Sequence, residues 1–152
     1  MREGFAWFGR APTSGERVVD LGGAPGGWAY TALAAGAHVI AVDRAPLEPP
    51  AAGHPALEMV LGNAFTYRPA APVDWLLCDV ICAPDRTIEL AAKWLGEAWC
   101  RDLCATLKFK GAGDYGAITR AREVLAPLAP GFLRIKHLRN HNNEAVILAS
   151  RT

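Results

Sequence analysis

The stretch RVVDLGGAPGGW, residues 17–28, carries the clearest structural pattern in the chain. It opens with a short apolar run, residues 17–21, and a turn that contains four glycines follows at once. Residues 28–35 favour a helix, which Gly36 ends, and HVIAVD at 38–43 has the composition of a second buried strand. This order predicts a βαβ unit with parallel strands and a right-handed crossover, with any ligand beyond the carboxyl ends of the strands.

The composition is typical of one globular domain. The chain has 152 residues, 51% hydrophobic and 20% charged, with a net charge of +1. We therefore expect a single domain over 1–152, long enough to form a core without disulfides. Because the charge is nearly balanced, any RNA contact must be a local patch or come from a partner. No apolar run approaches the roughly 18 residues of a membrane span and residues 1–10 lack a signal-peptide core, so a cytoplasmic protein is expected.

The remaining pattern extends the alternation of strands and helices. After a Pro- and Ala-rich loop at 44–55, we expect strands at 57–61, 73–80, 105–110, 132–138 and 145–150, and helices at 85–103 and 115–126. The longer helix has an apolar stripe at spacings of three and four, with Asp85 as its N-cap, and Pro127 ends the other helix. A polar turn at 139–143 joins the last two strands. The expected fold class is α/β, a seven-stranded, mostly parallel sheet with an antiparallel last strand.

Cysteines and histidines give no clear metal pattern. Cys78, Cys82, Cys100 and Cys104 form two CxxxC pairs, whereas structural zinc sites usually contain CxxC. We interpret them as buried reduced thiols, the last two near the end of the long helix. His137 and His141 have metalloprotease spacing, but Leu138 stands where the glutamate base would be. No metal site is therefore expected.

The glycine turn is a candidate cofactor loop, because a backbone without Cβ atoms lets a ligand approach closely. It does not match GxGxxG, since Ala24 occupies the place of the second glycine. Asp20, Gly22, Ala24 and Gly26 instead resemble motif I of S-adenosylmethionine-dependent methyltransferases. Asp43 ends the second strand, where a carboxylate can accept both hydroxyls of a ribose. The alternative is an ordinary aspartate that caps a turn.

Three charged residues, Asp79, Lys108 and Glu144, stand in or at the ends of predicted strands. Charges at such positions are costly unless they are paired or functional. Asp79 falls near the end of the fourth strand, which should lie beside the glycine turn. Lys110 shares a strand face with Lys108 by the period of two.

Several stretches together resemble the FtsJ-type family of RNA ribose 2′-O-methyltransferases. They are DLGGAPGGW at 20–28, CD at 78–79, LKFKGAGDY at 107–115 and NEAVILA at 143–149. VDWLLCDVICAP at 73–84 and KWLGEAWCR at 93–101 are most similar to members that act on bacterial large-subunit ribosomal RNA. The resemblance runs from about Phe5 to the C-terminus. It implies a Rossmann-like S-adenosylmethionine-dependent methyltransferase fold, S-adenosyl-L-methionine as cofactor, and RNA, in particular ribosomal RNA, as partner.

The resemblance also assigns roles to residues. The family uses a Lys-Asp-Lys-Glu tetrad, to which Asp79, Lys108 and Glu144 correspond, with Lys108 as general base and the two acids orienting it. The alternative is a salt-bridged Lys108 without turnover. The cationic cofactor and burial would lower the pKa of Lys108, and the two carboxylates would raise it. The implied cofactor-binding residues are Asp20, Gly22, Gly23, Ala24, Pro25, Gly26, Gly27, Trp28, Asp43, Arg44, Asn63, Ala64 and Asp79, with Asn63 and Ala64 beside the adenine.

The chain departs from the family at the first tetrad lysine, which lies upstream of the first strand. The first lysine here is Lys93, and Arg2, near the equivalent place, cannot act as a base. Similar family members also carry an N-terminal RNA-binding part, so a missing N-terminal domain or an RNA-binding partner chain is expected.

Two other functions therefore stay open. One is a catalytically incomplete cofactor-binding module that acts with an RNA-binding partner, and the other is a small-molecule methyltransferase with residues 46–55 as a lid. A modest basic rim is expected from Arg10, Arg44, Lys110, Arg134, Lys136 and Arg139.

Overall fold

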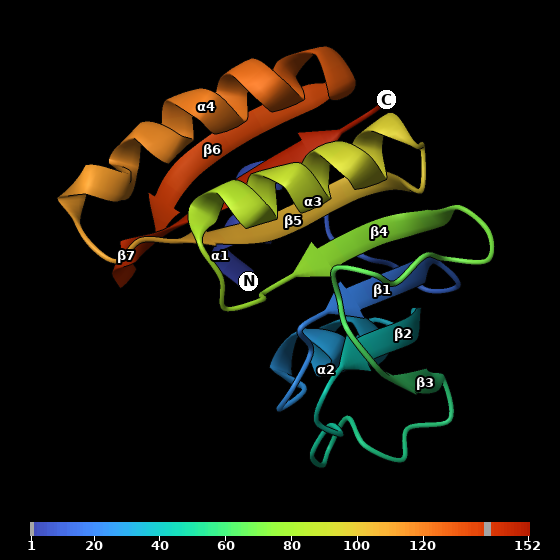
Figure 1. Cartoon of the computed structure of the whole chain (residues 1–152). Helices are drawn as coiled ribbons and strands as arrows, with labels where there is room; N and C mark the ends of the chain where they lie inside the picture. Colours follow the sequence, from blue (N-terminus) through green and yellow to red (C-terminus); the bar gives the residue numbers. More distant parts are fainter. Residues whose placement is uncertain (1, 139–140) are drawn as a thin grey trace.

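The computed structural model describes residues 2–138 and 141–152, and that part of the chain forms one seven-stranded sheet (Figure 1). The strands are β1 (Arg17–Leu21), β2 (His38–Asp43), β3 (Leu57–Leu61), β4 (Val73–Cys78), β5 (Cys100–Lys108), β6 (Phe132–Leu138) and β7 (His141–Ser150). Their order is β3-β2-β1-β4-β5-β7-β6. The pairs among β1 to β5 are parallel, and β7 is antiparallel to both its neighbours. The predicted fold class is confirmed.

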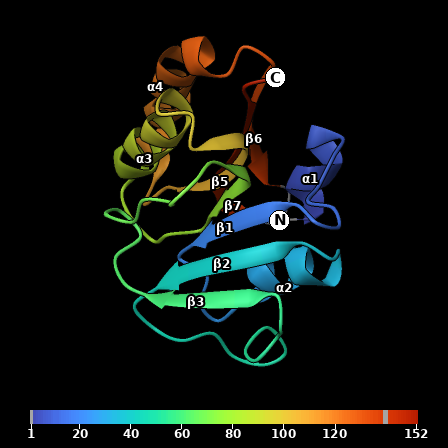
Figure 2. The same cartoon turned by 90° about the vertical axis from the view of Figure 1, so that its right-hand side faces the viewer.

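Helices cover both faces of the sheet. Figure 2 shows α3 (Pro84–Gly96) and α4 (Gly116–Leu125) on one face and α1 (Arg2–Phe8) and α2 (Gly27–Ala34) on the other. Short 3-10 turns, η1 (Ala112–Tyr115) and η2 (Ala126–Leu128), flank α4. Because strand side chains alternate, Leu76 packs in one layer and Trp75 and Leu77 in the other. None of the helices in the described part of the chain combines the length and the apolar character that crossing a membrane requires.

The predicted βαβ unit of β1, α2 and β2 is confirmed. Gly22 has φ of +75°, and a Cβ there would lie 2.8 Å from Val80 Cγ2 and 3.0 Å from its backbone nitrogen. Only glycine therefore lets the chain that leaves β1 pass this close to the chain that leaves β4. Gly26, at the N-cap of α2, has φ of +124° and turns the backbone into the helix.

The expected helix at 85–103 is wrong beyond residue 96. α3 ends at Gly96, Ala98 adopts φ of +57°, and Cys100 already belongs to β5. The apolar spacing continued by chance into β5, because a strand buried on both faces is apolar at every position and matches a helical stripe too. Asp85 is not the N-cap either. Ala83 takes that position, with Pro84 as the first helical residue.

Smaller differences concern the strand ends and the N-terminus. β4 stops at Cys78, so Asp79 and Val80 lie beyond it. β7 begins at His141 instead of 145, because the backbone ladder continues through polar residues, with the Phe109 amide donating to the Asn143 carbonyl at 2.7 Å. Of the expected turn at 139–143, residues 139 and 140 lie outside the described part. The sequence reading did not predict α1.

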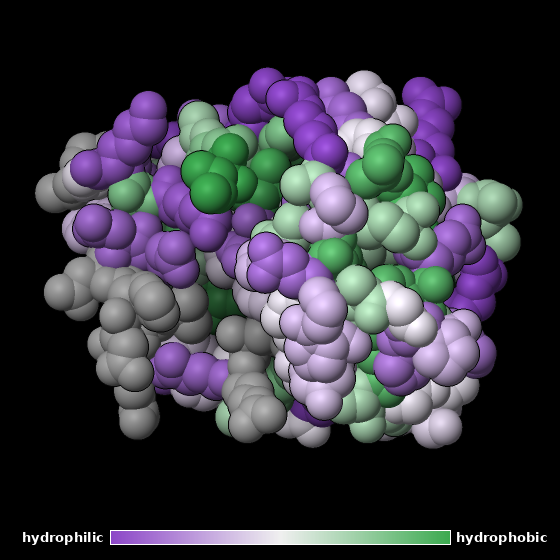
Figure 3. All heavy atoms as spheres, turned by 90° about the horizontal axis from the view of Figure 1, so that it is seen from below, coloured by the Kyte–Doolittle hydropathy of each residue, from purple (hydrophilic) through white to green (hydrophobic). Residues whose placement is uncertain are grey.

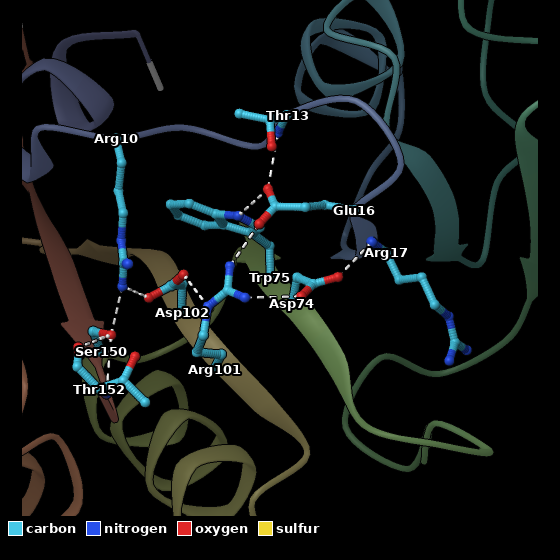
Figure 4. Close-up of polar contacts among 10 residues, drawn as sticks. All are labelled: Arg10, Thr13, Glu16, Arg17, Asp74, Trp75, Arg101, Asp102, Ser150 and Thr152. Carbon is cyan, nitrogen blue, oxygen red and sulfur yellow. Dashed lines mark hydrogen bonds and ion pairs between the residues drawn. The ribbon is translucent and has the colours of Figure 1, made fainter.

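The amino ends of the strands carry a network that anchors the connection between α1 and β1 (Figure 4). Arg10 pairs with the fully buried Asp102 and donates to Ser150 Oγ at 2.6 Å. Arg101 pairs with Asp102 at 2.9 Å and with Glu16 at 2.6 Å. Two guanidinium groups thus offset the desolvation of the buried carboxylate. The network fixes the start of β1 at the edge opposite the carboxyl ends.

The cysteines are free thiols. Cys78, Cys100 and Cys104 are buried, as predicted, and burial raises the pKa of each to about 12. The latter two lie in β5 and not in a helix. Cys82 is partly exposed, with Sγ 3.2 Å from the Thr87 hydroxyl.

Candidate active site

A cavity of about 480 Å³ opens at the carboxyl ends of β1, β2, β4 and β5. This volume is in the usual range for small-molecule sites, and parallel α/β sheets bind ligands at this edge. The lining includes Gly22, Ala24, Asp43, Arg44, Asn63, Ala64, Asp79 and Lys108, all named from the sequence. Other predicted residues do not line the cavity: Asp20, Gly23, Pro25, Gly26, Gly27, Trp28 and Glu144.

Asp43 joins the glycine loop to the end of β2. Its Oδ2 accepts the amide of Ala24 at 3.0 Å, and its Oδ1 accepts the amide of Ala45 at 3.1 Å. The carboxylate therefore caps the turn, as the alternative to a ribose-binding role predicted. Each oxygen keeps a further lone pair, and the residue lines the cavity, so the side chain also has the capacity to accept ribose hydroxyls.

Asp20 lies directly beneath the same loop. The residue is fully buried, and neither carboxylate oxygen has a hydrogen-bond partner of ordinary geometry among the described residues. Burial and, after it, the charge of Asp79 raise the pKa of Asp20 to about 7; the Ala29 backbone amide in the first turn of α2 opposes this, and the charge of Asp43 adds a smaller rise. A Cβ on Gly23 would lie 3.0 Å from Asp20 Oδ2. The loop is thus packed tightly on the carboxyl group.

The segment at 46–55 packs beneath the glycine loop. Leu47 and Ala51 are buried with α2, the Glu48 amide donates to the Pro25 carbonyl at 2.8 Å, and a Cβ on Gly26 would lie 3.0 Å from Ala51. None of these residues lines the cavity. The expectation that 46–55 forms a lid is therefore wrong, because its apolar side chains are used to cover the sheet. Trp28 is partly buried against the same core.

The opposite wall comes from the loops after β3 and β4. Asn63 Oδ1 accepts the Phe65 amide at 3.0 Å, so its side chain closes a local turn. The Arg86 guanidinium lies 4.1 Å from the centre of the Phe65 ring, and both residues line the cavity. Neither residue was predicted from the sequence. Phe65 lies in the loop after β3, but Arg86 belongs to the first turn of α3, and nothing in the local sequence links the two.

Ile81 also belongs to this wall and is 89% exposed. Leu61, at the end of β3, is 66% exposed. Figure 3 shows hydrophobic side chains that reach the surface between hydrophilic ones when the molecule is seen from below.

Lys108 lies between two carboxylates at one end of the cavity. Its Nζ is 2.8 Å from Asp79 Oδ1 and 3.3 Å from Glu144 Oε1. The pairing of β5 with β7 sets Lys108 opposite Glu144, and Asp79 follows β4 on the other side. Thr106, buried and two residues before Lys108, donates its hydroxyl to Asp79 Oδ1 at 2.6 Å. Thr106 was not predicted as a site residue, although its spacing of two residues from Lys108 places both on one face of the strand.

These carboxylates control the charge of Lys108. Burial lowers the pKa of its ammonium, but the hydrogen bond and charge of Asp79, together with Glu144, outweigh burial. The net result is a pKa above the usual lysine value. Without other ligands the side chain is therefore a cation, and the site strongly stabilises the protonated amine.

α1 packs across the middle of β5 and β7. A Cβ on Gly4 would contact Val146 and Cys104, whereas Phe5 and Phe8 pack against Trp75 near the start of β4. α1 thus runs from the middle of these strands toward their amino-end edge, where Arg10 pairs with Asp102. Arg2, the residue nearest the expected place of the first tetrad lysine in the sequence, is the first residue of α1, and its side chain lies outside the described part.

The prediction of one basic rim is wrong, because its residues do not form a single surface. Arg44 lines the cavity, but Arg10 belongs to the network at the opposite edge. Arg134 donates to the Trp7 carbonyl at 3.1 Å, and Lys136 lies 4.3 Å from the Trp7 ring centre, so both contact α1. Lys110 is exposed, and Arg139 is outside the described residues. These side chains come from different edges, which linear spacing does not reveal.

Comparison with known proteins decides the family. A model of the FtsJ-like methyltransferase family matches residues 3–106, more than half of the chain. The chain belongs to the FtsJ-like methyltransferase family. Among curated relatives, ribosomal RNA large subunit methyltransferase M of Thauera aminoaromatica is 38% identical over 137 residues, covering 88% of this chain. The protein of the same name from Laribacter hongkongensis is 37% identical over 142 residues, covering 90%.

Solved structures agree on the fold. An S-adenosylmethionine-dependent methyltransferase from Aquifex aeolicus has a TM-score of 0.64 at 14% identity, covering 99% of this chain and 89% of its own. The 1,6-didemethyltoxoflavin-N1-methyltransferase of Burkholderia thailandensis, solved with S-adenosylhomocysteine, has a TM-score of 0.63 at 17% identity, covering 99% and 75%. The chain spans about two fifths of the length of the curated relatives, 37% and 40% for the two named above.

The cofactor that the family implies is S-adenosylmethionine, and the residues present fit it. Gly22 and Ala24 leave the loop without bulky side chains, and Asp43 offers acceptors for a ribose. Asp43 and Asp79, which both line the cavity, place negative charge there, which suits a cofactor that carries positive charge.

Proposed function

We propose that this domain transfers a methyl group from S-adenosylmethionine to the 2′-hydroxyl of a ribose in RNA. The observation that carries the proposal is Lys108 Nζ, held 2.8 Å from Asp79 and 3.3 Å from Glu144 at one end of the cavity. A hydroxyl becomes a nucleophile only as it loses its proton, so a positioned base is the group that this reaction requires.

Each part of the site has a role in this proposal. The cofactor, when bound, supplies an electrophilic methyl group. The glycine loop and Asp43 hold the cofactor, and Lys108, as a neutral amine, orients the ribose hydroxyl and accepts its proton at Nζ as the oxygen attacks. Asp79 and Glu144 stabilise the ammonium that forms. The same two acids keep Lys108 protonated at rest, so the amine must lose that proton before each turnover.

We further propose ribosomal RNA as the substrate, with residues 1–152 acting as one catalytic domain. The names of the relatives support this choice, since they are ribosomal RNA methyltransferases. The nearly neutral charge and the dispersed arginines and lysines support a further RNA-binding part, in the same polypeptide or in a partner chain.

A methyl-transfer assay tests the activity. Labelled S-adenosylmethionine and transcribed large-subunit ribosomal RNA are incubated with the protein, and 2′-O-methylation is read as resistance of the adjacent phosphodiester to alkali. Lys108→Ala is expected to abolish transfer while S-adenosylhomocysteine still binds. Lys93→Ala, a change at an exposed lysine of α3 that does not line the cavity, is the matched control and should retain transfer.

The same assay decides between an enzyme and a cofactor-binding module. Full methyl transfer by Lys108→Ala would show that Lys108 is not the base. If the wild type binds the cofactor but transfers no methyl group, with or without an RNA-binding partner, the catalytically incomplete module is favoured. The absence of a match to the first tetrad lysine in this sequence supports that alternative.

A further inference from the structure

An aromatic cluster lies beside the proposed base and is not used by the mechanism above. It consists of Phe109, which directly follows Lys108, Tyr115 at the end of η1, and His137 near the end of β6. The Tyr115 ring centre is 5.2 Å from that of Phe109 and 5.1 Å from that of His137. Figure 1 shows the end of β5, the start of β7 and the end of β6 at the same edge of the sheet.

Burial within this cluster is uneven. Phe109 is 5% exposed and belongs to the core, whereas Tyr115 is 38% exposed and His137 is also exposed. Both ring contacts of Tyr115 are edge-to-face, with interplanar angles of 86° and 81°, so neither is a parallel stack. Tyr115 and His137 therefore leave ring surface open to solvent, while the Phe109 ring beneath them is buried.

The cluster is fixed rigidly to the proposed catalytic residues. The Phe109 amide donates to the Asn143 carbonyl at 2.7 Å, and these two residues directly follow and precede Lys108 and Glu144. The loop that carries Tyr115 is itself closed by Asp114, whose carboxylate accepts the Lys110 amide at 2.8 Å. A ligand that stacks here is therefore held at a constant position relative to Lys108.

We propose that Tyr115 and His137, supported by Phe109, form a stacking shelf for a nucleobase next to the ribose that is methylated. The inference rests on the proposed function and adds how the RNA strand is held. Unpaired bases stack on exposed aromatic and histidine rings, and such contacts tolerate any base because every base has a flat face. Lys110, exposed in the same loop, offers a charge for the adjoining phosphate.

The stacking shelf is tested by measuring how tightly the protein binds a labelled oligoadenylate of about ten nucleotides. Fluorescence anisotropy at low salt gives the affinity. Tyr115→Ala should weaken binding about tenfold, and Tyr115→Phe should retain it, because stacking needs the ring and not the hydroxyl. His137→Ala should weaken binding about threefold. This variant tests the shelf independently if Tyr115→Ala does not fold. Tyr30→Ala is the matched control, since Tyr30 is similarly exposed, at 43%, but lies on α2.

An oligonucleotide that lacks its bases separates stacking from backbone contacts. The wild type should bind it about as weakly as Tyr115→Ala binds the intact strand, and the variant should not distinguish the two ligands. S-adenosylhomocysteine affinity should be the same in all variants. If the wild type methylates RNA but Tyr115→Ala and His137→Ala bind the intact strand like the wild type, the shelf is wrong and the proposed function stands. If the wild type neither binds the strand nor methylates RNA, even when an RNA-binding partner is added, both are wrong.

Discussion

Thr106 donates its hydroxyl hydrogen to Asp79 Oδ1 at 2.6 Å, and this is the same oxygen that pairs with Lys108. Two β5 side chains thus contact one oxygen of the carboxylate, although Asp79 itself lies in the loop after β4. A short hydrogen bond from a buried hydroxyl to a charged acceptor is strong and restricts the position of that oxygen. The position of the proposed base therefore depends on a residue that never reaches the cavity.

Thr106→Val should lower kcat for methyl transfer about tenfold while leaving the KM for S-adenosylmethionine within about twofold. The substitution keeps the shape but removes a hydrogen bond to a charged group, which contributes about 1.5–3 kcal/mol. Thr106→Ser, which restores the donor, should recover most of the rate. Equal kcat for the wild type and Thr106→Val would show that Asp79 needs no such support.

The rate of methyl transfer should rise with pH through neutrality, because only the neutral form of Lys108 accepts a proton and its pKa is raised. Glu144→Gln removes one of the two negative charges that raise this pKa. The rising limb should therefore move to lower pH in that variant. Single-turnover rates across the pH range measure the shift, and an unchanged limb in Glu144→Gln would contradict the assignment of the base.

Asp43→Ala should weaken binding of S-adenosylhomocysteine by about tenfold or more, equivalent to about 1.4 kcal/mol. The side chain also accepts the amides of Ala24 and Ala45, so the variant loses both ligand acceptors and loop support. Asp43→Asn keeps one acceptor oxygen and should lose less affinity. Titration calorimetry on folded protein measures both, and wild-type affinity in Asp43→Ala would place the cofactor elsewhere.

Asp20 should make folding stability depend on pH. Its folded-state pKa is about 7, raised from 3.8, so the folded protein holds a proton that the unfolded chain releases above about pH 4. The stabilisation that this proton adds to the folded state is complete below about pH 4 and is lost as the pH rises to about 7. The free energy of unfolding therefore falls by up to roughly 4 kcal/mol over this range.

Asp20→Asn stays neutral and should lack this dependence. The difference in free energy of unfolding between wild type and variant, measured by urea denaturation at several pH values, isolates the effect from other titrating groups. A difference that stays constant between pH 4 and 7 would mean that Asp20 does not titrate in that range.

Local sequence was sufficient for the βαβ unit around the glycine turn. The bounds of β1 and β2 match the prediction, because a short apolar strand, a turn that requires positive φ at Gly22 and Gly26, and a helix that Gly36 ends are all encoded by neighbouring residues. The chemistry of the charged residues was also visible, since a lysine and two acids in or beside apolar strands are costly unless they have partners.

The end of α3 and the roles of residues far apart in the sequence follow from long-range packing and strand pairing. Residues 100–103 fit a helical stripe and a buried strand equally well, and the pairing of β5 with β4 and β7 selects the strand. The sequence suggested that Arg10 belongs to a basic rim and that residues 46–55 form a lid, but the fold takes both to other surfaces. Side-chain periodicity is a local property. The meeting of Thr106, Asp79, Lys108 and Glu144 depends on strand pairing between distant segments, which only the folded sheet specifies.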